Sequence, residues 1–306
     1  MNQNAISTWL PWSDRAGRVS VLKLVCFAAL VAPLLWMIAE WRLGYLSPKP
    51  VTDLLRESGD WAMRLLVVSL AITPLRWVTR WNKLIMVRRM SGLAALYYTL
   101  LHIALWCVDL NFAWMQILTE MFLRLFLTVG LAATLVMAAL GVTSNDYFIR
   151  RLGAQRWNQL HAWAYAAALL SVVHYFMEVK LDATEAALMG GLFALLMAFR
   201  AVRKYATPGF LALAATALAC AFATALMEAC YYVYSTRVGF ARVLLANFDF
   251  SYTIRPAWWV LAAGTAIAAL AAWRNRTAPA PSVQRKSAAR AGAAALQKPL
   301  ASSGAE

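Results

Sequence analysis

The stretch "WNQLHAWAYAAALLSVVHY", residues 157–175, places His161 and His174 thirteen positions apart in a run that is otherwise almost entirely apolar. The hydrocarbon core of a bilayer is about 30 Å thick and takes roughly 20 helical residues to cross, so this run is long enough to span it. An ionisable side chain is costly at that depth and marks a functional site by default. The stretch therefore predicts a membrane-spanning helix with two functional histidines.

The composition of the whole chain supports this interpretation. Of its 306 residues, 62% are hydrophobic and 14% are charged, and the mean hydropathy is +0.58, which excludes a soluble globular domain. The apolar residues gather into blocks that predict an all-α, polytopic bundle of about eight transmembrane helices. The predicted spans are Val21–Trp41, Trp61–Val78, Ser91–Leu110, Met121–Val142, Trp157–Phe176, Thr184–Phe199, Pro208–Tyr234 and Pro256–Trp273.

Charge placement predicts the orientation of the helices, because Lys and Arg gather in cytoplasmic loops. The base-rich segments are 76–89, 146–156, 200–204 and the tail after Trp273, and they alternate with the acid-rich connections 109–120 and 178–185. Both termini are therefore expected on the cytoplasmic side. Only the connection 237–255, with three arginines and one aspartate, argues against its outward placement.

Other features exclude several functions. The net charge of +15 comes from bases at helix ends and in the tail, which indicates contact with membrane lipid and not with nucleic acid. No small-residue cleavage site follows the first apolar block, so we expect a retained helix and not a signal peptide. No glycine-rich nucleotide loop is present, and the four cysteines form no CxxC pair. Nicotinamide chemistry is therefore expected to need a partner protein.

The three histidines of the chain, His102, His161 and His174, all lie within predicted spans. Two neutral imidazoles on facing helices can hold one haem iron from both sides. At a rise of about 1.5 Å per residue, His102 lies roughly 20 Å beyond Arg89, and His174 lies about 27 Å beyond Arg156. His161 lies only about 8 Å beyond Arg156. These depths pair His102 with His174 at an outer haem iron and leave His161 for an inner one.

The inner level has no second histidine, because Arg88 stands fourteen residues before His102. On a regular helix, a spacing of thirteen residues turns His161 and His174 about 140° apart. Either a local irregularity between them or haems approached from different sides is therefore required. A transporter or proton relay built on buried histidines is the alternative from a different functional class.

Four motifs carry a family resemblance. They are "GDWAMRLLVVSLAITPLRW" (59–77), "RRMSGLAALYYTLLH" (88–102), "LTVG" (127–130) and "LGVTSNDYFIRRLGAQRWNQLHAWAYAAALLSVVHYFMEVK" (140–180). Over residues 59–204 the chain resembles the MsrQ (YedZ) family. Its members are the haem-binding membrane subunits of the periplasmic methionine sulfoxide reductase system and are related to ferric reductases.

The resemblance implies an electron-transfer subunit of an oxidoreductase system in the bacterial inner membrane, with two b-type haems and FMN as a further candidate cofactor. Its implied partners are a cytoplasmic flavin reductase or the quinone pool and a periplasmic molybdenum-containing methionine sulfoxide reductase. By motif, His102, His161 and His174 are haem-ligand positions, and Arg88 is a cofactor-binding residue at the position where the related NADPH oxidases have a fourth histidine. The resemblance places no catalytic residue on the chain, and a transmembrane ferric reductase acting on chelated iron is the alternative.

The chain departs from the family at its C-terminal end. We expect residues 1–58 to form the cytoplasmic N-terminus, first span and outer loop, 59–204 the haem-binding bundle, 205–273 an additional two-span hairpin and 274–306 a disordered basic tail. Within the hairpin, Glu228 is a lone intramembrane acid. It indicates either a quinone or proton site or a carboxyl that is hydrogen-bonded to a neighbouring helix.

Overall fold

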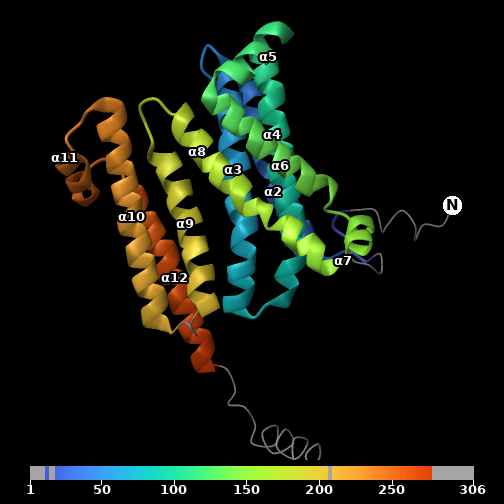
Figure 1. The fold of residues 1–306 in the computed structure, drawn as a ribbon, viewed down its shortest axis with the longest axis vertical. Helices are drawn as coiled ribbons and strands as arrows, with labels where there is room; N and C mark the ends of the chain where they lie inside the picture. The colour runs from blue at the N-terminus through green and yellow to red at the C-terminus, as the bar shows by residue number, and fades with distance from the viewer. Residues whose placement is uncertain (1–10, 14–17, 206–208, 278–306) are drawn as a thin grey trace, which may run out of the picture.

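The computed structural model describes residues 11–13, 18–205 and 209–277, which form helices and connecting turns (Figure 1). The long helices are α2 (Val21–Leu43), α3 (Pro50–Thr79), α4 (Ile85–Asp109), α6 (Leu125–Val142), α9 (Thr184–Tyr205), α10 (Phe210–Thr236) and α12 (Pro256–Thr277). The others are α5 (Trp114–Leu123), α7 (Asp146–His161), α8 (Trp163–Glu178) and α11 (Phe240–Leu245). With α7 and α8 counted together, eight described segments are long and apolar enough to cross a membrane. The predicted all-α polytopic bundle is thereby confirmed.

The helices pack into two cores that meet at α9. The first core joins α2, α3, α4, α6 and α8 to one face of α9, and the second joins α9 to α10 and α12. Small residues allow close packing in the second group, as membrane helices require. A Cβ atom on Gly191 of α9 would lie 2.3 Å from the Thr224 hydroxyl of α10, and one on Gly264 of α12 would lie 2.5 Å from Ala217. Figure 1 shows α9, α10 and α12 side by side on the left.

Several predicted boundaries differ from the observed ones. The predicted span Met121–Val142 is divided at Arg124, because the backbone there is extended and separates α5 from α6. The base-rich segment 146–156, expected as a connection, belongs to α7 and is helical on both sides of a kink at Gly153, whose φ is 74° and ψ 156°. The last helix continues to Thr277, so the predicted tail begins later than residue 274. The remainder of that tail, residues 278–306, lies outside the described residues, as does Pro208.

A tyrosine hydroxyl joins two backbone groups of helix α2 on either side of its proline. Pro33 lies inside α2, and Tyr98 of α4 places its hydroxyl between two backbone groups one turn apart. The hydroxyl donates to the oxygen of Leu30 at 3.0 Å and accepts from the N–H of Leu34 at 2.9 Å. Because lipid offers no partner for these backbone groups, the inserted hydroxyl satisfies both of them.

Replacing Tyr98 by Phe is expected to weaken the attachment of α2 to α4. The change removes both hydrogen bonds with little change in volume, and hydrogen bonds between membrane helices are worth about 1 kcal/mol each. We expect a lower midpoint of thermal unfolding in detergent. Tyr97→Phe is the matched control, because Tyr97 is the adjacent residue and is 66% exposed. Equal midpoints for the two variants would contradict the bridging role.

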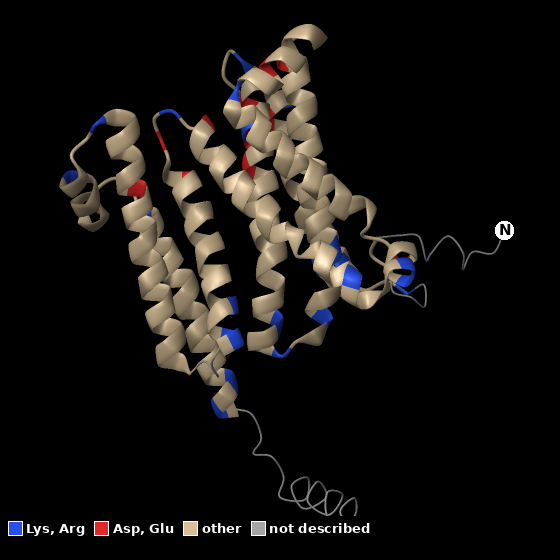
Figure 2. Cartoon of the chain, in the orientation of Figure 1, with Lys and Arg blue, Asp and Glu red and all other residues tan. Residues whose placement is uncertain are grey.

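The two ends of the bundle differ in the sign of their charged residues. Figure 2 shows acidic residues gathered towards the upper end, whereas basic residues mark the lower ends of α3, α4, α9 and α12. The bases at this end, which we name the basic end, are Arg76, Arg80, Lys83, Arg88, Arg89, Arg203, Lys204, Arg274 and Arg276. The opposite end is named the acidic end and contains Asp109, Glu178, Asp182 and Glu185. This polarity is typical of a membrane protein whose basic end faces the cytoplasm.

Candidate functional site

His102 is positioned by a carbonyl and a glycine of the neighbouring helix α3. Its Nδ1 lies 2.8 Å from the backbone oxygen of Leu55. The ring packs on Gly59, where a Cβ atom would come within 3.0 Å of Nδ1. A carbonyl oxygen can only accept a hydrogen bond, so Nδ1 carries the proton, and in the neutral ring Nε2 keeps its lone pair. His102 therefore has the tautomer that can bind iron through Nε2.

His174 is positioned in the same way by helix α6. Its Nδ1 lies 2.7 Å from the backbone oxygen of Phe126, and a Cβ atom on Gly130 would lie 2.8 Å from Nδ1. The carbonyl and the glycine are four residues apart on α6, as they are on α3 beside His102. Residues at this spacing share one face of a helix, so a single turn presents both groups to the ring. His174 has the same tautomer as His102.

The structure brings the helices of these two histidines into one group, because α4 contacts α6 and α8 contacts α3. Helix α4, which carries His102, packs on α3, and helix α8, which carries His174, packs on α6. Each ring thus has its Nδ1 edge bound to its own partner helix, and its Nε2 makes no hydrogen bond with a described residue. Two neutral imidazoles of this kind fit the axial ligand set of a haem iron.

His161 has a different environment at the basic end. Its Nε2 lies 3.3 Å from the hydroxyl of Thr143, and its ring stacks on Trp157 with centroids 3.8 Å apart. The Thr143 hydroxyl donates to the oxygen of Ala139 at 2.8 Å, which leaves it free to accept from Nε2. In this arrangement Nδ1 keeps the lone pair. His161 is therefore held by the hydroxyl of Thr143 and the indole of Trp157, whereas His102 and His174 are each held by a backbone carbonyl and a glycine.

The helix that carries His161 and His174 is interrupted between them. Helix α7 ends at His161 and α8 begins at Trp163, and Ala162 joins them with a turn in which its oxygen accepts from the N–H of Tyr165 at 3.0 Å. A bond over three residues tightens the helix locally. This is the kind of irregularity that the spacing of thirteen calls for.

Arg88, the fourth predicted site residue, lies at the basic end and not beside the other two histidines. It belongs to the first turn of α4, fourteen residues before His102. Arg89, beside it, pairs with Asp146 at 2.9 Å. The structure thus divides the predicted residues into a pair in the bundle, His102 and His174, and a second group at the basic end.

Gly130→Ala is expected to impair haem binding at His174. The new Cβ atom would lie 2.8 Å from Nδ1 and 2.9 Å from Cε1, so the ring must move away from the Phe126 carbonyl. Overpacking of this kind costs about 1–3 kcal/mol, which corresponds to roughly a 5- to 150-fold loss of affinity. Haem per protein, measured as the pyridine haemochrome, should fall. Gly209→Ala is the control, because nothing lies within 4 Å of its Cβ position. Unchanged haem content in Gly130→Ala would contradict the positioning role of this glycine.

A polar network adjoins the residues that hold the histidine pair. Tyr175, next to His174, donates a hydrogen bond to Asp60, which is next to Gly59. One turn further along α3, Arg64 pairs with Glu185 of α9 at 2.7 Å. These contacts tie α3 to α8 and α9 close to both rings. Sequence reasoning missed them, because the partners are more than 100 positions apart.

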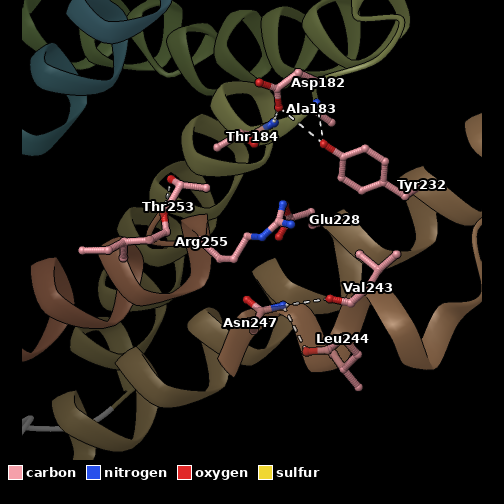
Figure 3. A network of polar contacts seen from close by, with 11 residues as sticks. Asp182, Ala183, Thr184, Glu228, Tyr232, Val243, Leu244, Asn247, Thr253 and Arg255 are labelled. Atoms are coloured by element: carbon pink, nitrogen blue, oxygen red, sulfur yellow. Dashed lines mark hydrogen bonds and ion pairs between the residues drawn. The ribbon is translucent and has the colours of Figure 1, made fainter. Parts of the chain in front are cut away.

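Glu228 in the additional hairpin forms an ion pair (Figure 3). Its side chain is fully buried, and Oε1 lies 3.2 Å from the guanidinium of Arg255, whose side chain is 27% exposed. The interpretation of Glu228 as a carboxyl bonded to a neighbouring segment is therefore supported. Arg255 is also one of the three arginines that argued against an outward connection 237–255, and Glu228 neutralises its charge.

The hairpin also holds the connection that follows the helix of His174. The Tyr231 hydroxyl donates to the oxygen of Val179. The Tyr232 hydroxyl accepts from the N–H of Ala183 at 3.2 Å, as Figure 3 shows. Beside them, the side chain and backbone N–H of Thr184 bind Asp182 and hold the pKa of that carboxyl below its usual range. The sequence indicated these tyrosines only as aromatic residues of the membrane interface.

Comparison with known proteins places the site in a family. Residues 58–172 match the family described as ferric reductase like transmembrane component. The chain is 39% identical over 190 residues to the "Protein-methionine-sulfoxide reductase heme-binding subunit MsrQ" of Rhodospirillum rubrum, covering 62% of this chain and 89% of that protein. Proteins of the same name from Xanthomonas oryzae pv. oryzae and Caulobacter vibrioides are 38% and 36% identical, with 61% and 58% of this chain and 88% and 83% of theirs covered. No solved structure matches the chain.

Proposed function

The chain belongs to the MsrQ family of protein-methionine-sulfoxide reductase heme-binding subunits, and from this premise we propose which residues carry its electrons and between which partners. It is a haem-binding membrane subunit that transfers electrons within a methionine sulfoxide reductase system. The observation that carries the proposal is the matched pair His102 and His174, each with Nδ1 bound to a backbone carbonyl. Such a pair suits a b-type haem whose iron is bound on both faces.

His102 and His174 would hold the outer haem, and His161 an inner one near Arg88. A haem bound by two histidines supplies one-electron transfer without an open iron site for a substrate. The protein's own residues orient the two imidazoles, place the proton on Nδ1 through their carbonyl partners and exclude water with the apolar side chains of the first core.

The direction of transfer follows from the polarity of the bundle. With the basic end in the cytoplasm of a bacterium and the protein in its inner membrane, electrons enter from a flavin reductase or a quinol and leave at the acidic end. The acceptor there is a periplasmic molybdenum-containing methionine sulfoxide reductase. A membrane potential that is negative inside favours this movement by about 2.3 kcal/mol per 100 mV for a full crossing. FMN is a further candidate cofactor at the cytoplasmic side.

Reporter fusions test this orientation. A fusion after Lys180, at the acidic end, should report the periplasm, and one after Lys204, at the basic end, should report the cytoplasm. We expect a clear difference, because the base-rich ends are retained in the cytoplasm. The reverse result would overturn the proposed direction of electron flow.

Reconstitution tests the function itself. The protein in liposomes is reduced with flavin reductase and NADH or with a quinol, and the oxidised periplasmic enzyme is then added with methionine sulfoxide. Haem reoxidation coupled to methionine formation should follow and should be absent in His174→Ala. Haem that is reoxidised by a ferric chelate but not by that enzyme would instead favour the ferric reductase alternative. The match of residues 58–172 to ferric reductase like components makes this the relevant competitor.

A further inference from the structure

The connection between α10 and α12 folds back along the outside of the bundle. It contains α11 and the 3-10 turn Ala246–Phe248. Helix α11 packs on α10, and Figure 1 shows it at the left edge of the bundle, beside the upper part of α10 and not above it. Helix α10 is itself long and apolar enough to cross the membrane. The connection therefore lies at the membrane surface and does not extend into the water beyond the acidic end.

One side of this connection is fixed to the hairpin. Val243 and Asn247 are four residues apart and buried. The backbone oxygen of Asn247 accepts from the indole N–H of Trp258 in α12 at 2.7 Å, and its side-chain amide donates to the oxygen of Leu244 at 3.3 Å. These contacts determine which side chains of the connection point away from the protein.

The other side of the connection exposes large apolar side chains. The exposed fractions are 66% for Leu245, 70% for Phe248, 55% for Phe250 and 94% for Tyr252. Such a cluster is unfavourable in water, whereas aromatic side chains are enriched where a membrane meets water. A short apolar face beside a transmembrane helix is typical of a segment that lies in the membrane interface.

Two exposed arginines accompany this apolar face. Neither Arg237 nor Arg242 forms an ion pair or a side-chain hydrogen bond with a residue that the structure describes. The third arginine of the connection, Arg255, pairs with Glu228. Asp249, its one acid, accepts from a backbone N–H of its own loop at 3.0 Å. Two positive charges are therefore available to an anion from outside the chain.

We propose that residues 237–254 form a phospholipid-binding surface in the membrane leaflet at the acidic end. The apolar side chains of 245–252 enter the acyl region, and the guanidiniums of Arg237 and Arg242 bind headgroup phosphates. Guanidinium bonds to phosphate are charge-assisted and often bidentate, and the two positive charges favour an anionic phospholipid. The place of α11 on the flank of a span favours lipid over a soluble protein, which would approach the end of the bundle.

This surface also explains the charge of the connection. Lys and Arg are expected mainly on the cytoplasmic side, and residues 237–255 were the exception among the outward connections. Arg255 is neutralised within the protein, and the remaining two arginines would be neutralised by lipid phosphate. The proposal concerns the additional hairpin alone and does not depend on the haem sites.

Lipid binding by the purified protein tests the proposal. The protein in detergent is titrated with phosphatidylglycerol or with phosphatidylcholine, and bound lipid is counted by native mass spectrometry. We expect tighter binding of phosphatidylglycerol and about a fivefold loss of its affinity in each of Arg237→Gln and Arg242→Gln. Arg56→Gln is the matched control, because Arg56 is an exposed arginine near the start of α3 at the same end of the bundle. An equal loss in this control would reduce the effect to net charge and contradict the proposal.

Hydrogen–deuterium exchange in lipid nanodiscs locates the contact. Backbone amides of residues 240–252 should exchange more slowly in phosphatidylglycerol than in phosphatidylcholine, and the double variant Arg237→Gln with Arg242→Gln should lose this difference. Equal exchange of the wild type in the two lipids, or wild-type affinity of the double variant for phosphatidylglycerol, would overturn the proposal. Protection that develops only when the soluble methionine sulfoxide reductase of the system is added would assign the surface to a protein and would also overturn it.

Discussion

His102→Ala and His174→Ala are each expected to remove the same haem, the outer one, and to leave the inner haem largely in place. Each variant deletes one of the two imidazoles that we propose as ligands of the outer haem, so that haem would lose a ligand inside an apolar bundle. His161→Ala should affect the inner haem first, because His161 lies apart with Trp157 and Thr143. Electron transfer to the periplasmic acceptor should be abolished in both outer variants.

The measurement is haem per protein together with redox titration of the remaining haem. The two outer variants should share one residual spectrum and one midpoint potential, and these should differ from those of His161→Ala. His174→Ala combined with His102→Ala should lose no more haem than either change alone, since ligands of one iron act as a unit. If His102→Ala and His161→Ala removed the same haem, the proposed pairing would be wrong.

Arg255→Leu is expected to have the largest effect on stability. Glu228 is fully buried, and its Oε2 has no hydrogen-bond partner among the described residues, so Arg255 is its principal compensation. Breaking a buried ion pair by removing one partner costs about 3–5 kcal/mol, and the partial exposure of Arg255 places the expected cost towards the lower value. The free energy of unfolding in detergent measures this directly. The carboxyl of Glu228 should become protonated, which infrared spectroscopy detects as a new carbonyl band.

The double variant Glu228→Leu with Arg255→Leu is the decisive control. Replacing both charges by apolar groups removes the unpaired charge and is often neutral, so the double variant should be more stable than Arg255→Leu alone. If Arg255→Leu were as stable as the wild type, the ion pair would have no structural role. The interpretation of Glu228 as part of a quinone or proton site would then be favoured.

Hydropathy was sufficient to predict the membrane-spanning architecture. In lipid, each span must hydrogen-bond its backbone polar groups within its own helix and expose apolar side chains. The limits of α5 and α7 were not predicted. Trp114–Leu123 is as apolar as a span, and only the extended backbone of Arg124 separates it from α6. In α7 the charges resemble those of a loop, although Asn145 caps a helix there by accepting from the N–H of Phe148.

The three histidines could be found in the sequence because ionisable residues are rare in spans. Their supporting groups could not be found in the same way, because Leu55 and Phe126 act through backbone oxygens, which any residue supplies. Gly59 and Gly130 lie within the motifs that carried the family resemblance, yet their contacts with the rings depend on helix packing. Arg200 was visible only as a base in a cytoplasmic turn, since the carbonyl of Leu70 to which it donates is 130 residues away.

The carbonyl and glycine that hold each imidazole have a consequence for biogenesis. They belong to the helix pairs α3–α4 and α6–α8, so the orientation of both rings is determined by helix packing and does not depend on iron. The bundle is therefore expected to assemble before its prosthetic group arrives. Cells starved of haem precursors should accumulate a protease-resistant apoprotein that acquires colour when haemin is supplied after translation has been stopped.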